Sequence, residues 1–152
     1  MTQEKLFDLM RKTESSFAVF YIKLHQHHFY VKGPNFLALH EAFETLYDEV
    51  TAHYDEIAER LMMLDGKPYG MMAKYLEESI ISEAPYVEKS DKEMLREIVE
   101  DLRLFTKHFE EAIELSGELG DSVTEDLYIG YKTSFDKHIW MYQARLGLDA
   151  TE

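Results

Sequence analysis

The chain has 152 residues, of which 45% are hydrophobic and 30% are charged, and this suits one folded domain over residues 1–152. No apolar run approaches the roughly 20 residues of a membrane-spanning helix, and the opening MTQEKLFDLMRKTESS lacks the apolar core of a secretory signal, so we expect a cytoplasmic protein with no membrane partner. The lack of cysteine excludes disulfides, thiolate metal sites and cysteine nucleophiles, while a net charge of −14 disfavours nucleic acid and favours cations as partners.

Glycine and proline are scarce, and they lie where a helical chain needs breaks. The apolar spacing between these breaks predicts helices near residues 3–32, 36–65, 71–80, 91–116 and 122–146. Ser90 with Glu93, and Asp121, offer N-terminal caps for the last two helices. No stretch shows the period-2 alternation of a strand. The sequence therefore predicts an all-α four-helix bundle with a short extra helix between its second and third long helices.

Side chains that commonly bind metals stand at His28, His40, Glu44, Asp55 and Glu59. On the predicted helix 36–65 the last four share an arc of roughly 100°. His40 and Glu44 nevertheless lie about 22 Å along the helix from Asp55 and Glu59. When two copies of this helix pack antiparallel about a twofold axis, His40 and Glu44 of one copy meet Asp55 and Glu59 of the other. The pattern therefore predicts a metal site built between two subunits.

The same spacing has a second interpretation that needs no metal, because these carboxylates could form a solvated helix face supported by i,i+4 pairs. Large apolar residues such as Phe43, Leu46 and Tyr54 interleave with the four ligands, so we expect part of the face to be buried, and buried carboxylates need partners or a metal. Imidazole and carboxylate without sulfur suit iron or manganese and, less selectively, zinc.

One missing motif narrows the class of metal protein. Di-iron bundles that hold both metals within one subunit use Glu-x-x-His on facing helices. None of the seven histidines has a glutamate three positions before it. The sequence therefore gives no support to an ordinary di-iron site inside one bundle.

The run KLHQHHFYVKGPNFLALHEAFETLYDEVTAHYDEIAERL, residues 23–61, closely resembles the signature of the Dps family of mini-ferritins. The segments GDSVTEDLYIG (120–130) and DKHIWMYQARLG (136–147) resemble the last helix of that family, so the similarity covers nearly the whole chain. The motif H-x11-H-x3-[DE]-x10-D-x3-E is long and specific.

The resemblance implies a ferritin-like bundle that assembles into a hollow dodecamer and works as a ferroxidase. In the family, His28, His40 and Glu44 come from one subunit and Asp55 and Glu59 from its mate, and together they hold a pair of iron ions. Fe²⁺ is oxidised there, preferably by hydrogen peroxide, and ferric oxyhydroxide is stored in the shell. The implied activity is iron storage coupled to peroxide detoxification.

Some positions depart from the family pattern or have two interpretations. Phe29 stands where family members usually have tryptophan, and Glu44 where many have aspartate. The resemblance places Asp121 and Asp126 at threefold pores through which iron enters, whereas the local sequence also suits a helix cap and a helix-dipole role. Gly117 replaces a further acidic pore residue.

DNA compaction without enzymatic activity is the competing function, because some Dps proteins bind DNA through lysine-rich tails. Lys5, Arg11 and Lys12 are here balanced by nearby acids, and the printed sequence ends in DATE. We therefore expect DNA binding to be unlikely, since an acidic shell repels phosphate.

Overall fold

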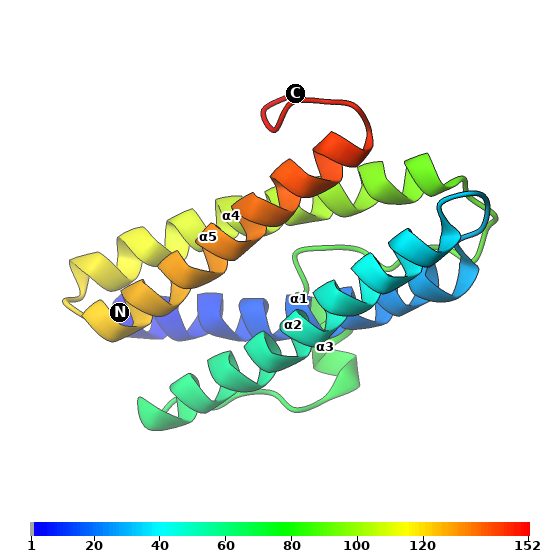
Figure 1. Cartoon of the computed structure of the whole chain (residues 1–152). Coiled ribbons are helices and arrows are strands. Elements are labelled where there is room, and N and C mark those ends of the chain that lie inside the picture. Colours follow the sequence, from blue (N-terminus) through cyan, green and yellow to red (C-terminus); the bar gives the residue numbers. More distant parts are fainter. Residues whose placement is uncertain (1) are drawn as a thin grey trace. The chain divides into compact units, whose positions relative to one another are not determined.

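The computed structural model describes residues 2–152, and in this part of the chain all regular structure is helical (Figure 1). The helices are α1 (Thr2–Tyr30), α2 (Phe36–Met63), α3 (Met72–Glu78), α4 (Asp91–Glu118) and α5 (Ser122–Arg145). Each lies within a few residues of its predicted position, and the short α3 lies in the connection between α2 and α4, as expected. None of these helices is long and apolar enough to cross a membrane.

The predicted caps are present at both helix starts. The Ser90 hydroxyl accepts the backbone N–H of Glu93 at 3.1 Å, and the Asp121 carboxylate accepts that of Thr124 at 3.0 Å. Each bond satisfies an N–H that has no partner inside its helix. The caps fix where α4 and α5 begin.

Contacts divide the chain into two compact units, Met10–Met94 and a second unit of Leu95–Glu152 with the residues up to Leu9. In the first unit, α1 and α2 pack through fully buried aromatic and aliphatic residues, including Phe17, Phe20, Phe43 and Leu46. Ring pairs between α1 and α2 run from Phe17–His53 at 5.7 Å to His28–His40 at 3.6 Å, which shows that the two helices are antiparallel.

The irregular segment between α3 and α4 is held against α1 by polar side chains. Lys23 donates to the Ser82 carbonyl at 2.8 Å, and Gln26 donates to the Ala84 carbonyl at 3.2 Å. These bonds give two backbone oxygens of the segment a partner in the absence of regular secondary structure. The segment therefore follows a defined path along α1.

In the second unit, α4 and α5 share an aromatic core. The Phe109 ring lies 5.2 Å from Phe135 and 5.9 Å from Tyr128, and all three residues are fully buried. Aromatic rings bury large apolar areas, which stabilises this helix pair. That residues 1–152 form a single domain stays a prediction.

Candidate metal centre

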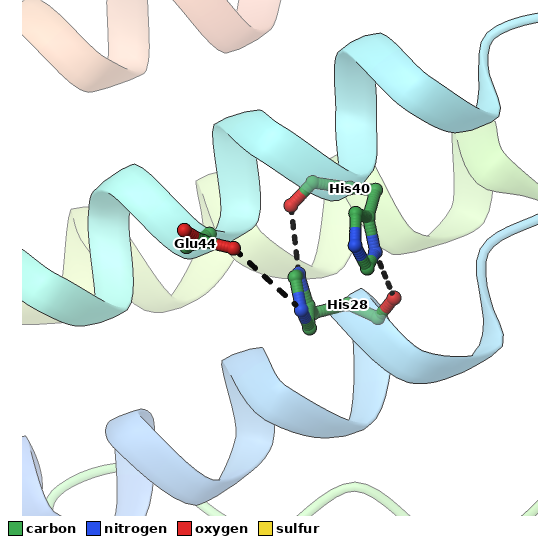
Figure 2. A group of neighbouring side chains, drawn as sticks. All are labelled: His28, His40 and Glu44. Atoms are coloured by element: carbon green, nitrogen blue, oxygen red, sulfur yellow. Dashed lines mark hydrogen bonds and ion pairs between the residues drawn. The ribbon is translucent and has the colours of Figure 1, made fainter.

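His28 near the end of α1 and His40 in the second turn of α2 face each other across the antiparallel pair (Figure 2). Their rings stack with centroids 3.6 Å apart at an interplanar angle of 13°. His28 Nδ1 lies 2.7 Å from the His40 carbonyl oxygen, and His40 Nδ1 lies 2.9 Å from that of His28. Each histidine is thus anchored to the backbone of the other's helix.

These bonds determine which ring nitrogen of each histidine can bind a cation. A carbonyl oxygen only accepts, so Nδ1 must carry the hydrogen in both rings. The neutral imidazole then has its lone pair on Nε2, the atom that a metal ion binds. His28 and His40 therefore present a matched pair of free Nε2 donors.

Glu44, one turn after His40, adds a carboxylate to this pair. Its Oε1 lies 4.0 Å from His28 Nε2, and one ligand atom from each of the three residues falls within 4.8 Å of the others. In the described residues this is the one group of three or more histidine or acidic side chains close enough to hold a metal ion. A small shift of the mobile carboxylate would bring all three atoms onto one ion.

Asp55 and Glu59 lie together further along α2, on successive turns, and do not reach His28, His40 or Glu44 within one chain. The Asp55 carboxylate accepts a hydrogen bond from protonated Glu59, and this bond and the negative charge of Asp55 raise the pKa of Glu59 above its ordinary value. Two carboxylates that repel in this way share a proton or attract a cation. The sequence-predicted ligands therefore form two groups in the chain, one complete triad and one acidic pair.

The ligand face of α2 is partly buried within the single chain, at His40, whereas burial of its carboxylates by a second subunit stays a prediction. His28 is buried and His40 half-buried, whereas Glu44, Asp55 and Glu59 are exposed in the isolated chain. Of the large apolar residues that interleave with them, Phe43 and Leu46 are fully buried, while Tyr54 is half-buried and contacts Tyr75 of α3. The exposed acids are thus free to meet another chain or a cation.

Aromatic rings surround the histidine pair. Phe36 stacks on His40 at 5.0 Å, while Tyr47 approaches His28 edge-on at 5.2 Å and stacks on His25 at 3.7 Å. Tyr47 follows Glu44 by three positions, which is a helix-face signal that could have revealed it. Phe29 is 66% exposed and lies 5.8 Å from His28, so it forms an outer edge of this wall.

The two acids predicted to line a pore have different surroundings. Asp121 uses one oxygen for the Thr124 backbone N–H and the other for the Thr124 hydroxyl, at 3.0 and 2.6 Å, so it caps α5. Asp126 is exposed in the second turn of α5. A Cβ placed on Gly117 would lie 2.5 Å from Oε2 of Glu125, so that carboxylate covers the glycine. None of these three observations tests whether the acids line a pore.

Comparison with known proteins places the chain in a family. Residues 12–151 match the Ferritin-like domain. The "DNA protection during starvation protein" of Listeria monocytogenes serovar 1/2a is 42% identical over 130 residues, covering 85% of this chain and 83% of that protein.

Solved structures agree with this family and with the predicted fold. The X-ray structure of Dps from Listeria monocytogenes superimposes with a TM-score of 0.95 at 37% identity, covering 97% of this chain and 96% of that one. Dps from Listeria innocua, soaked with zinc, gives a TM-score of 0.94 at 37% identity over 97% of this chain and 99% of that one. The all-helical ferritin-like fold is therefore confirmed, and the chain belongs to the Dps family of ferritin-like proteins.

Proposed function

We propose that the protein is a ferroxidase that oxidises Fe²⁺ and stores the ferric product, with His28, His40 and Glu44 as the primary iron ligands. The observation that carries this proposal is the reciprocal anchoring of the two histidines, which leaves Nε2 of each ring available as a ligand atom. One ligand atom from each of His28, His40 and Glu44 also lies within 4.8 Å of the others. Imidazole and carboxylate together suit Fe²⁺, and the carboxylate favours Fe³⁺ after oxidation.

Asp55 and Glu59 complete the centre when they come from a second subunit. Within one α2 they lie about 22 Å from His40 and Glu44, and a twofold axis between two antiparallel copies of α2 removes this separation. Their mutual repulsion, seen in the raised pKa of Glu59, is relieved by a bound cation. The second subunit thus supplies the negative charge that holds and bridges a pair of iron ions.

Hydrogen peroxide is the proposed oxidant. Each of two Fe²⁺ ions gives up one electron, and two protons combine with the reduced peroxide to form two molecules of water. Because the two electrons leave together, no hydroxyl radical is released. This consumes peroxide and ferrous iron in one reaction, and it makes peroxide detoxification part of iron storage.

The remaining parts of the proposal concern assembly and transport. Twofold dimers assemble into a hollow cytoplasmic dodecamer in which ferric oxyhydroxide collects. Asp126, and to a smaller extent the capping Asp121, line threefold pores whose negative potential concentrates Fe²⁺. The exposed position of Asp126 supports this role, whereas both oxygens of Asp121 already accept hydrogen bonds.

The test is stopped-flow absorbance of ferric species after Fe²⁺ and peroxide are mixed with the protein. The double variant His28→Ala/His40→Ala should lose the fast phase, because each substitution removes one Nε2 ligand. His138→Ala is the matched control, since it changes a histidine of α5 outside the triad. Equal fast phases in the wild type and the double variant would refute the ligand assignment.

DNA protection is the second candidate, and it is favoured by the name of the Listeria monocytogenes relative. The charge of −14 opposes direct binding to phosphate. We propose that protection of DNA, where it occurs, follows from removal of iron and peroxide and does not need DNA binding.

A further inference from the structure

Three side chains, one each from α1, α2 and α3, form a hydrogen-bonded chain of two phenol hydroxyls and a carboxylate. The Tyr75 hydroxyl donates to Oε2 of Glu14 at 2.6 Å, and the Tyr54 hydroxyl lies 2.7 Å from that of Tyr75. Tyr75 has one hydroxyl hydrogen, and Glu14 receives it. Tyr54 must therefore donate to Tyr75, so the chain runs from Tyr54 through Tyr75 to Glu14.

The end of this chain is removed from water. Glu14 is 1% exposed and Tyr75 is 4% exposed. The Glu14 carboxylate also accepts the backbone N–H groups of Tyr69 and Gly70 at 3.1 Å, and these bonds hold it in place beside Tyr75.

A tyrosine in this arrangement cannot ionise at ordinary pH, but it can lose an electron and a proton together. Burial and the neighbouring Glu14 carboxylate raise the pKa of Tyr75 far above its usual range. Loss of an electron makes a phenol a strong acid, and a carboxylate 2.6 Å away can take the proton without any movement of heavy atoms. The same bond that keeps the phenol protonated at rest thus lowers the barrier to its oxidation.

Aromatic side chains link the candidate metal centre to this chain within the same compact unit. His28 contacts Tyr47 at 5.2 Å, and Tyr47 contacts Tyr21 at 6.0 Å. Tyr21, Tyr54 and Tyr75 line one cavity of about 250 Å³ between α1, α2 and α3. Ring contacts therefore lead from the metal ligand to Tyr21, and Tyr21 shares a cavity with the hydrogen-bonded Tyr54 and Tyr75.

We propose that Tyr75 is a redox-active tyrosine that reduces strong one-electron oxidants formed at the candidate metal centre, with Glu14 as its proton acceptor. The oxidant considered is the hydroxyl radical, which arises when one Fe²⁺ reacts alone with peroxide. The radical takes one electron and becomes hydroxide. Tyr75 loses that electron through Tyr21 and Tyr47, and its O–H proton moves to Glu14, which leaves a neutral tyrosyl radical and a carboxylic acid.

The site returns to its resting state by the reverse transfer. One Fe²⁺ gives an electron to the tyrosyl radical and becomes Fe³⁺, and Glu14 returns the proton to the Tyr75 oxygen. The sum is one hydroxyl radical reduced to hydroxide and one Fe²⁺ oxidised. A harmful by-product of iron oxidation is thereby converted into further ferric iron.

This inference rests on the proposed function for its natural oxidant. The experiment tests the redox role of Tyr75 separately from ferroxidase activity. The metal-free protein is oxidised in a light flash by ruthenium(II) tris-bipyridine with a cobalt(III) ammine as quencher, so no iron is needed. Electron paramagnetic resonance then follows the tyrosyl signal. We expect a long-lived radical in the wild type, its loss in Tyr75→Phe, and its retention in Tyr86→Phe, which changes a tyrosine that is 77% exposed.

The hydrogen bond from Tyr54 gives a signature that a merely structural role would not produce. Tyr54→Phe removes the donor to the Tyr75 oxygen and leaves Glu14 in place. The radical should persist in this variant with a larger gx value at high field, since gx rises when a tyrosyl oxygen loses a hydrogen bond. An unchanged gx would place the radical elsewhere and overturn the proposal.

Glu14→Gln tests the proton acceptor. The amide oxygen can still accept a backbone N–H, but the amide cannot take the phenolic proton, so the long-lived radical should be lost. Circular dichroism and thermal melting show whether each variant is folded. If Glu14→Gln unfolds, the Tyr75→Phe and Tyr54→Phe results decide the question by themselves. A long-lived signal that survives Tyr75→Phe would refute the assignment even if ferroxidase activity is present.

Discussion

His28 and His40 hold each other in place, because Nδ1 of each ring donates to the backbone carbonyl of the other residue at 2.7 and 2.9 Å. The consequence is that neither ring can rotate to offer Nδ1 without breaking a hydrogen bond. Preorganised ligands lose less conformational freedom when a cation binds. The triad of His28, His40 and Glu44 is thus prepared on one chain. The proposed function takes Asp55 and Glu59 from a second subunit.

Mixed dimers provide the sharpest test of this division. One parent carries His28→Ala/His40→Ala and the other Asp55→Ala/Glu59→Ala, and each should lose the fast ferroxidase phase. A mixed dimer contains one doubly damaged site and one intact site, because the intact histidines face the intact acids. Random pairing of the two parents should therefore restore about a quarter of the wild-type rate.

The two parents are mixed by unfolding and refolding them together. The control is the histidine variant alone, carried through the same unfolding and refolding. It should stay inactive. Rates measured by stopped flow that remain at the level of the parents after mixing would mean that the acids act on their own subunit or not at all.

How far the sequence predicts this molecule depends on which signal each element carries. The helix boundaries follow from Gly, Pro and capping residues, and the Ser90 and Asp121 caps are observed as expected. Ligand type and spacing place His40 and Glu44 on one helix face, and the resemblance to the Dps family adds His28 to them. The path of the α3–α4 connection and the bonds of Glu14 could not be predicted, since they depend on contacts between residues 55 to 61 positions apart that no local periodicity reveals.

The Asp55–Glu59 pair predicts a pH-dependent stability. Asp55 raises the pKa of Glu59 in the folded chain, so the folded state binds more protons than the unfolded state between the ordinary and the raised pKa. The stability of the metal-free protein therefore falls as the pH rises through this window. Asp55→Asn should be more stable than the wild type above the window and equal to it in acid, where both carboxyls are protonated.

Urea denaturation across the pH range measures this difference. Glu41→Gln, which neutralises another exposed carboxylate of α2, should not reproduce the pH dependence. A constant gap between Asp55→Asn and the wild type down to acid pH would contradict the coupling.

Gly117 and Gly66 should respond in opposite ways to alanine. A Cβ on Gly117 meets only the flexible Glu125 carboxylate, which can rotate away, so Gly117→Ala should stabilise α4 by up to about 1 kcal/mol. A Cβ on Gly66 lies 2.5 Å from Leu61 Cδ2 and 3.1 Å from the Leu61 carbonyl oxygen. Because Leu61 is buried, Gly66→Ala should cost roughly 1–3 kcal/mol. Thermal melts of both variants in parallel provide the comparison.

The acidic surface predicts that the protein does not retard duplex DNA. With a net charge of −14 per chain, phosphate contacts gain little counterion-release free energy at neutral pH and physiological salt. A gel-shift titration at sub-micromolar protein measures this, with a lysine-tailed fusion as the positive control. Retardation by the wild type would show that a local surface binds DNA in spite of the negative net charge of the chain.

The charge and the capping role of Asp121 can be separated by two substitutions. Asp121→Asn removes the charge but keeps an oxygen for the Thr124 N–H, so stability should change little. Asp121→Ala removes the cap as well and should cost about 1 kcal/mol. An effect of Asp121 on iron transport is measured by comparison with substitutions of Asp126, whose exposed carboxylate does not cap α5.

Iron uptake at limiting Fe²⁺ makes that comparison. If Asp126 focuses cations at a pore, Asp126→Asn should slow uptake and leave both the melting temperature and the ferroxidase rate at saturating Fe²⁺ unchanged. Asp121→Asn should slow uptake less, since its charge is already engaged by two hydrogen bonds. High salt should reduce the difference between the wild type and Asp126→Asn, because screening weakens the attraction of exposed charges. Equal uptake by all three proteins at low salt would exclude these acids from the path of iron.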